Sequence, residues 1–239
     1  MIIFGGGHND YYGNELYSVS LQSGNVQRIT DPGLPLAAGC SESVANGSQP
    51  NSRHTYDGIE YIEATDEMFV FGGSLACGAG DFGDDTWTFD FATQNWSRRT
   101  PSGPTPWCDA GVMTAYDSVT GLVFLHDRQY LYSFDSRSNS YSRLSSSNAG
   151  FSYYGAATID PVRKKLVIIG AGFAFWYDIS PGSSYEKQIL STSGGASIVN
   201  SGYPGLAYDS STDRILAWNG GDTVYSLNLD TGAWTPMSY

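Results

Sequence analysis

The chain contains one short pattern five times, and this repetition restricts its fold more than any other feature does. In the clearest copy, over residues 54–96, an alternating segment is followed by a turn, an apolar run, a glycine pair, a second alternating segment and a last strand with a tryptophan. Alternation predicts half-buried strands, a continuous apolar run predicts a strand buried on both faces, and Gly, Asp and Asn clusters predict turns. Each copy is therefore predicted to form a four-stranded antiparallel sheet. Such a sheet cannot bury both faces alone, so the copies must pack against one another.

The copies recur at a nearly constant interval along one predicted domain, residues 1–239. They cover approximately residues 1–30, 54–98, 110–144, 153–190 and 203–237. The equivalent positions after the second strand are Gly5, Gly72, His126, Gly170 and Gly220. The later intervals are about 50 residues, and the longer first interval holds an insertion between Asp31 and Ser52. This period predicts the blades of a β-propeller.

The best copy carries Phe71-Gly72-Gly73, followed by the spaced aromatics Trp87 and Trp96. This pattern resembles kelch-repeat β-propellers over nearly the whole chain, and the propeller of galactose oxidase is related to that type. The first and last copies have weaker versions of the pattern, and the third and fourth lack a clean glycine pair. The resemblance implies an all-β, kelch-type β-propeller with five visible four-stranded blades.

The first copy lacks its inner strand, because Met1 already falls within the second strand of the pattern. Either the first blade has lost this strand or the chain is a fragment. We favour a fragment, in which case the five copies would belong to a six- or seven-bladed ring.

The composition excludes some partners and favours one compartment. A net charge of −12 argues against nucleic acids and anionic membranes, which need a basic surface. Charged residues make up only 15% of the chain, which is typical of an extracellular or periplasmic surface, although the N-terminus has no signal peptide. We expect a monomer. Cys40, Cys77 and Cys108 could form one disulfide or remain three free thiols, and their wide spacing disfavours a metal site.

The unusual residues gather in loops that should open on one face. In the predicted sheets, the turn between strands two and three and the link to the next blade lie on the same side, and in kelch-type propellers that side is the mouth of the central channel. These loops contain all three histidines, whereas the opposite turns are ordinary Asp/Ser/Thr/Gly turns. The predicted ligand-binding residues, apart from those assigned to catalysis below, are Asn9, Asp10, Trp107, Asp109, His126, Asp127, Tyr153 and Tyr154.

Several of these residues also have a structural interpretation. Arg53 and His54 follow Pro50 in a pattern that resembles the kelch link that ties neighbouring blades together. His126 could belong to a solvated, salt-bridged turn with Asp127 and Arg128. Trp107 could stack on a sugar or cap a blade.

Two functions remain open. Aromatic rings with convergent polar groups suit a glycan, and some kelch-type propellers are polysaccharide lyases. For β-elimination of a uronate, Arg53 or Arg128 would hold the carboxylate, His8 or His54 would be the base, and Tyr11 or Tyr12 the acid. The alternative is a non-catalytic scaffold that binds a protein on the same face. Ligand binding is favoured over catalysis.

No cofactor is predicted. The three histidines, His8, His54 and His126, could hold a divalent metal with Asp10 if their loops converge. Copper-radical chemistry of the galactose oxidase kind is disfavoured, because the sequence has no Tyr-His dipeptide.

Overall fold

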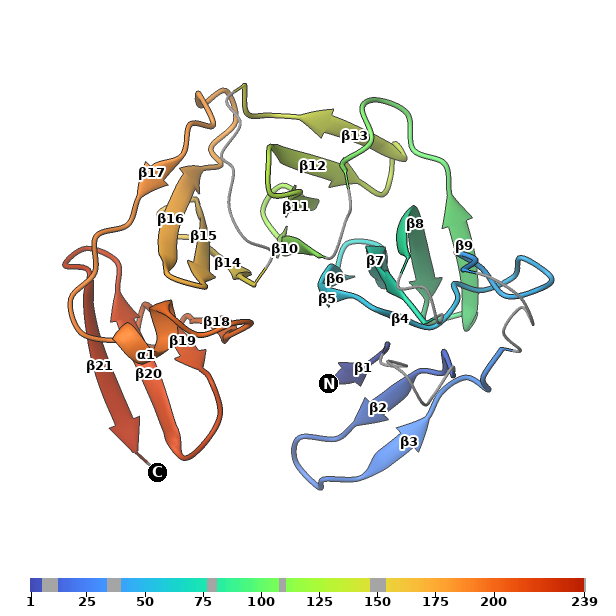
Figure 1. The fold of residues 1–239 in the computed structure, drawn as a ribbon, viewed down its shortest axis with the longest axis horizontal. Coiled ribbons are helices and arrows are strands. Elements are labelled where there is room, and N and C mark those ends of the chain that lie inside the picture. The colour runs from blue at the N-terminus through green and yellow to red at the C-terminus, as the bar shows by residue number, and fades with distance from the viewer. Residues whose placement is uncertain (6–12, 34–39, 77–80, 108–110, 147–153, 239) are drawn as a thin grey trace.

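A computed structural model describes residues 1–5, 13–33, 40–76, 81–107, 111–146 and 154–238. Five small β-sheets follow one another in chain order around a central axis (Figure 1). The prediction of an all-β propeller with five visible blades is confirmed.

The innermost strands of the sheets face the axis and the last strands lie on the outside (Figure 1). Blade one contains β1 (Ile2–Ile3), β2 (Tyr17–Val19) and β3 (Val26–Arg28). Blade two contains β4 (Arg53–His54), β6 (Ile59–Ile62), β7 (Glu67–Leu75), β8 (Phe82–Asp90) and β9 (Asn95–Arg99), and the short strand β5 (Tyr56–Asp57) between β4 and β6 joins the sheet of blade three. Blade three contains β10 (Val112–Asp117), β11 (Leu122–His126), β12 (Leu131–Asp135) and β13 (Ser140–Arg143). Blade four contains β14 (Ala156–Asp160), β15 (Lys165–Gly170), β16 (Phe173–Asp178) and β17 (Gln188–Ile189). Blade five contains β18 (Gly205–Asp209), β19 (Arg214–Trp218), β20 (Thr223–Asn228) and β21 (Ala233–Ser238), and is preceded by the short helix α1 (Ala196–Val199).

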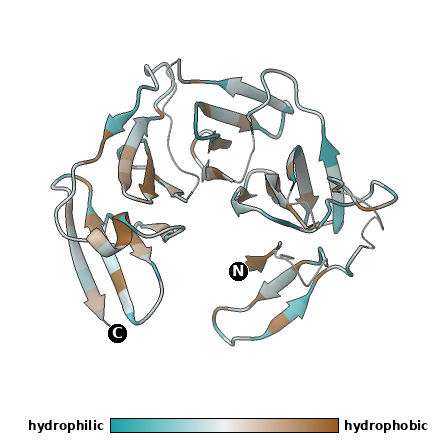
Figure 2. Cartoon of the chain, in the orientation of Figure 1, coloured by the Kyte–Doolittle hydropathy of each residue, from teal (hydrophilic) through white to brown (hydrophobic). Residues whose placement is uncertain are grey.

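The blades are held together by apolar layers between neighbouring sheets. In β15, Leu166 and Ile168 pack towards blade three, while the alternate residues Val167 and Ile169 pack towards blade five. The continuous apolar runs are thus buried on both faces, as the sequence predicts. Figure 2 shows the opposite character on the outside, where β9 and β17 are mostly hydrophilic. Burial between sheets, at about 25 cal/mol per Å² of apolar surface, is what favours the ring.

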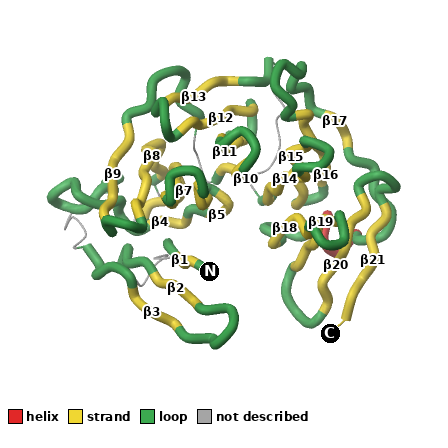
Figure 3. The backbone as a smooth tube through the Cα atoms, turned by 180° about the vertical axis from the view of Figure 1, so that it is seen from behind, coloured by secondary structure: helices red, strands yellow, loops and turns green. Residues whose placement is uncertain are grey.

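Seen from behind, the first and last sheets lie at the two ends of the row of blades (Figure 3). In the described part of the chain, no strand of blade one is hydrogen-bonded to a strand of blade five. The described segments also include no helix with the length and apolar character needed to cross a membrane.

Blade two differs from its predicted form at its first strand. The expected strand from Tyr56 to Glu63 is broken: β5 pairs in parallel with β10 of blade three, and only β6 pairs with β7. The chain turns at Tyr56, whose φ is 50°. This break takes Tyr56 out of the sheet of blade two and into the sheet of blade three.

The glycine pair of blade two also behaves differently from the prediction. Gly72 and Gly73 do not open a loop, because β7 continues through them to Leu75 with a shift of register between Phe71 and Gly73. At Gly73, φ is 99° and a Cβ atom would lie 2.3 Å from the carbonyl oxygen of His54. Glycine is therefore required for β4 to pair with β7.

Candidate ligand-binding face at the channel mouth

The structure places only part of the predicted site. His8, Asn9, Asp10, Tyr11, Tyr12, Asp109 and Tyr153 lie outside the described residues. The described members of the predicted site are Arg53, His54, Trp107, His126, Asp127, Arg128 and Tyr154.

Four aromatic residues from three segments of the chain form a connected group, which we call the mouth cluster: His54, Tyr56, Tyr154 and Tyr203. The rings of Tyr56 and Tyr203 are stacked, with centroids 4.9 Å apart and planes at 19°. His54 meets Tyr56 edge-on at 5.7 Å, and Tyr154 meets Tyr203 in the same manner at 5.1 Å. The structure thus brings together two predicted residues, His54 and Tyr154, with two that the sequence did not single out.

The local backbone holds these rings in place. Tyr154 and Tyr203 precede the innermost strands of blades four and five, and the amide of Tyr203 donates to the carbonyl of Tyr154 at 2.9 Å. Gly111, just before β10, lies against the ring of Tyr56, where a Cβ atom would be 3.1 Å from the ring. The links of blades two, three, four and five therefore meet at the mouth cluster.

The cluster has the properties of a stacking surface. Tyr154 is 40% exposed and Tyr203 is 36% exposed, while His54 and Tyr56 are partly buried. A tyrosine offers an apolar ring face to the C–H face of a sugar, and its hydroxyl can exchange hydrogen bonds with sugar hydroxyls. The ring contacts within the cluster limit the movement of the side chains, which lowers the entropy cost of binding.

Arg53 is not accessible to a ligand. Its side chain is fully buried and forms an ion pair with Asp85, whose second oxygen lies 3.2 Å from Nη2. Its guanidinium also donates to the backbone carbonyls of Asn51, Gly72 and Glu42. These contacts give Arg53 a structural role, but they tie the link to blade two itself and not, as predicted, one blade to its neighbour.

His126 is also buried rather than displayed in a loop. It is the last residue of β11, and its Nδ1 accepts a hydrogen bond from the amide of Arg128 at 3.0 Å. The proton is therefore on Nε2, which donates to the hydroxyl of Tyr177 at 2.7 Å. Burial lowers the pKa of His126 to about 3. With both ring nitrogens engaged, His126 is not available to a ligand or a metal, and the packing between blades three and four accounts for it.

Trp107, Asp127 and Arg128 do lie together. The carboxylate of Asp127 accepts hydrogen bonds from the amides of Trp107, Gln129 and Tyr130, at 3.0, 2.9 and 2.7 Å. The guanidinium of Arg128 lies 5.7 Å from the ring centre of Trp107, which is 48% exposed. Asp127 thus shapes the turn, and the Trp107–Arg128 pair is the part of this group that a ligand can reach.

Two carboxylates near the axis were missed by the sequence analysis. Asp57 in β5 accepts hydrogen bonds from the amides of Thr114 (3.2 Å) and Ala157 (2.8 Å), so that one side chain links blades two, three and four. Burial, together with the charge of Glu60, raises the pKa of Asp57 well above its usual range. Burial raises the pKa of Glu60 itself to about 7. No sequence signal indicates them, because both residues lie in what reads as an ordinary alternating strand.

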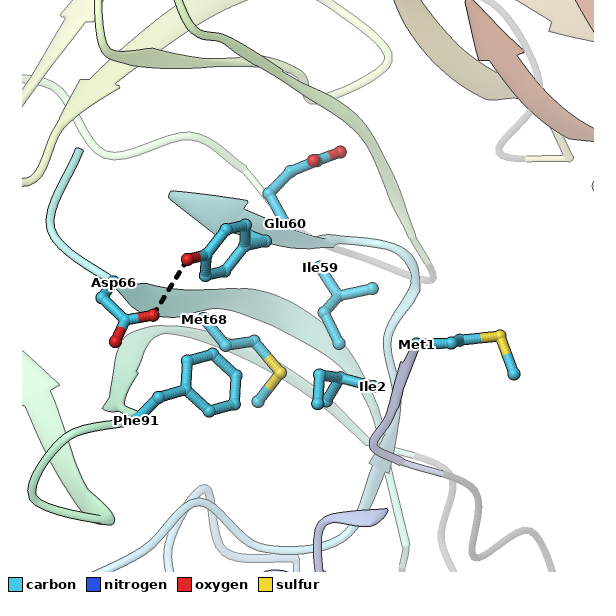
Figure 4. Close-up of a pocket in the computed structure, with 8 residues that line it drawn as sticks. Met1, Ile2, Ile59, Glu60, Asp66, Met68 and Phe91 are labelled. Carbon is cyan, nitrogen blue, oxygen red and sulfur yellow. Dashed lines mark hydrogen bonds between the residues drawn. The ribbon is translucent and has the colours of Figure 1, made fainter. Parts of the chain in front are cut away.

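An apolar pocket of about 510 Å³ lies between β1 and blade two (Figure 4). Ile2, Ile59, Met68 and Phe91 form its apolar walls. Its polar side chains are Glu60, Tyr61 and Asp66, and the Tyr61 hydroxyl already donates to Asp66 at 2.9 Å. Ligand sites usually combine apolar walls with several convergent polar groups, so this pocket is less suited to a glycan than the mouth cluster is.

Together, the five sheets define a five-bladed β-propeller, and an aromatic cluster lies beside the innermost strands of several of its blades. No protein-family model matches the chain, and no curated protein matches it in sequence.

Proposed function

We propose that this protein is a kelch-type propeller that binds a glycan at the mouth cluster. The observation that carries the proposal is the contact of Tyr56, Tyr154 and Tyr203, which come from β5 and from the links before β14 and β18 and leave two rings partly exposed. Rigid aromatic rings beside the mouth of a channel suit a polyhydroxylated ligand with apolar ring faces.

The charges favour a neutral glycan. Arg53, the predicted partner of a uronate carboxylate, is already paired with Asp85. The net charge of −12 also repels a long polyanion. Among the described residues that we predicted to be catalytic, only His54 belongs to the mouth cluster. We therefore propose binding without catalysis, and β-elimination would require His8, Tyr11 or Tyr12 to complete the site.

The proposal can be tested by affinity electrophoresis in gels that contain xyloglucan, galactomannan, polygalacturonate or alginate. We expect retardation by a neutral polysaccharide, and an affinity about three- to tenfold weaker for Tyr203→Ala and Tyr154→Ala, because each loses one stacking contact. Tyr61→Ala is the matched control, since Tyr61 is an exposed tyrosine outside the mouth cluster.

Equal retardation of Tyr203→Ala and the native protein would contradict the proposal, as would the absence of binding to all four polysaccharides. Incubation of the protein with the two uronate polysaccharides tests the lyase hypothesis. Absorbance from an unsaturated product would show that the protein also catalyses β-elimination, and the proposal of binding without catalysis would then be wrong.

We also propose that the protein is exported. Cys40 is disulfide-bonded, and structural disulfides persist in oxidising compartments. Mass-spectrometric mapping of protein purified without reductant should find Cys40 oxidised. Three free thiols in that sample would contradict export.

A further inference from the structure

A second pocket lies between blades one and two. We call it the rim pocket. It is bounded by residues 29–31 after β3, residues 47–49 in the link before β4, Trp87 of β8, and residues 94–96 and Arg98 around β9. Its volume is about 510 Å³, within the usual range of small-molecule sites. It shares no residue with the mouth cluster.

The charges around the rim pocket are already compensated. Asp31 forms an ion pair with Arg28 at 2.8 Å, and Arg98 forms one with Glu42. A charged ligand would therefore have to displace an existing partner. The groups that remain for a ligand are neutral.

These neutral groups are side-chain amides with unused hydrogen-bonding atoms. Gln49 accepts from Asn14 through its Oε1 at 3.1 Å, and no described residue bonds its Nε2. Asn95 donates from its Nδ2 to the carbonyl of Thr93 at 2.9 Å, which leaves its Oδ1 to accept. Gln94 is exposed at a turn position with φ 56°. Amides present a donor and an acceptor side by side, which matches neighbouring hydroxyls on a sugar ring.

An immobile aromatic side chain forms part of the wall. Trp96 is partly buried and contacts Phe4 and Phe89, with ring centroids 5.0 and 5.2 Å away. It also meets Trp87 edge-on at 6.4 Å, and the Trp87 indole is itself fixed by a hydrogen bond to Asp85. The exposed part of Trp96 is therefore held in position for stacking.

We propose that the rim pocket is a second, independent binding site for a neutral saccharide of one or two rings. Gln49, Gln94 and Asn95 would bind the hydroxyls, and Trp96 would contact a C–H face. The compensated charges select against uronates and amino sugars. The inference does not depend on glycan binding at the mouth cluster.

The probes are three neutral disaccharides with different linkages, namely cellobiose, maltose and lactose. Binding to the full chain is followed by saturation-transfer NMR and by tryptophan fluorescence. We expect at least one disaccharide to bind, and Gln94→Ala to weaken its affinity about three- to tenfold through the loss of one hydrogen-bonding group. Gln22→Ala is the matched control, because Gln22 is an exposed glutamine in a turn that does not line the pocket. Gln94→Glu provides a second variant, and its uncompensated charge should change the affinity while the fold is retained.

The variants also separate the two sites. Tyr203→Ala should leave disaccharide binding at the rim pocket unchanged. Failure of all three disaccharides to bind would overturn the proposal, and so would equal affinity in Gln94→Ala, Gln94→Glu and the native protein. Loss of binding in Tyr203→Ala would assign the signal to the mouth cluster, which would overturn the rim-pocket proposal and leave the proposed function standing.

Discussion

The ring of Tyr56 lies flat against the ring of Tyr203, although the first belongs to β5 and the second to the link that precedes blade five. Among the described residues, the apolar layers join neighbouring blades, whereas this contact joins β5 to the link before blade five. It forms because the links converge near the axis (Figure 1). The same convergence explains how Asp57 reaches backbone amides of two other blades.

Replacing Arg53 should destabilise the fold more than it affects any ligand. Arg53→Ala leaves the Asp85 carboxylate buried without its cation, and we expect the free energy of unfolding to fall by about 3–5 kcal/mol. Arg98→Ala removes a partly exposed ion pair with Glu42 and should cost about 0.2–1 kcal/mol. Urea unfolding measures both values. Equal losses in the two variants would contradict the structural role of Arg53.

His126 should make stability depend on pH in the acid range. Its folded-state pKa of about 3 is below its usual value of 6.5, so the unfolded chain binds the proton more tightly. The contribution of neutral His126 is complete above pH 6.5 and is lost as the pH falls towards 3. Urea unfolding at a series of pH values should show this slope in the native protein and a smaller one in His126→Gln.

Tyr177→Phe separates burial from hydrogen bonding at His126. Because burial is the main cause of the lowered pKa, this variant should keep the pH slope while it loses overall stability. An NMR titration in which His126 takes up its proton near pH 6.5 would refute this assignment.

Glu60 should make stability fall as the pH rises, which is the opposite of the effect of His126. Its folded-state pKa of about 7 is above its usual 4.5, so the folded protein binds the proton more tightly. The stabilising contribution is complete below pH 4.5 and is lost as the pH rises through 7. Glu60→Gln should therefore flatten the decline in stability between these two pH values, and Glu63→Gln, at an exposed position just after β6, should not. Identical pH profiles for the two variants would contradict the assignment.

Gly73→Ala should be much more damaging than an alanine at an open turn glycine. Gly24→Ala forces a side chain into a left-handed conformation with nothing nearby and should cost about 1–2 kcal/mol. Gly73→Ala adds a clash with the His54 carbonyl and should cost about 2–5 kcal/mol in total. Thermal and urea unfolding compare the two, and a Gly73→Ala variant as stable as Gly24→Ala would show that β4 can shift without cost.

The repeated strand pattern was enough to predict the sheets. Apolar runs such as 166–169 place apolar side chains on both faces of a strand. This pattern alone indicates a strand that is packed between two other sheets. The sequence did not show that Gly72 and Gly73 form a bulge and not a loop, because both structures use glycines with positive φ. The break at Tyr56 was missed for a similar reason, since alternation continues through it.

The sequence by itself determined most of the strands, their order and the two-sided burial that packs the sheets side by side, because these depend on periodicities within a few residues. Only the tertiary structure decided which polar and aromatic residues meet. Arg53 and His126 were predicted for the ligand-binding face but are buried, whereas Tyr56 was predicted only as a strand residue and also contacts Tyr203. The path of a link across the end of a ring depends on packing between distant segments, and no local pattern encodes that path.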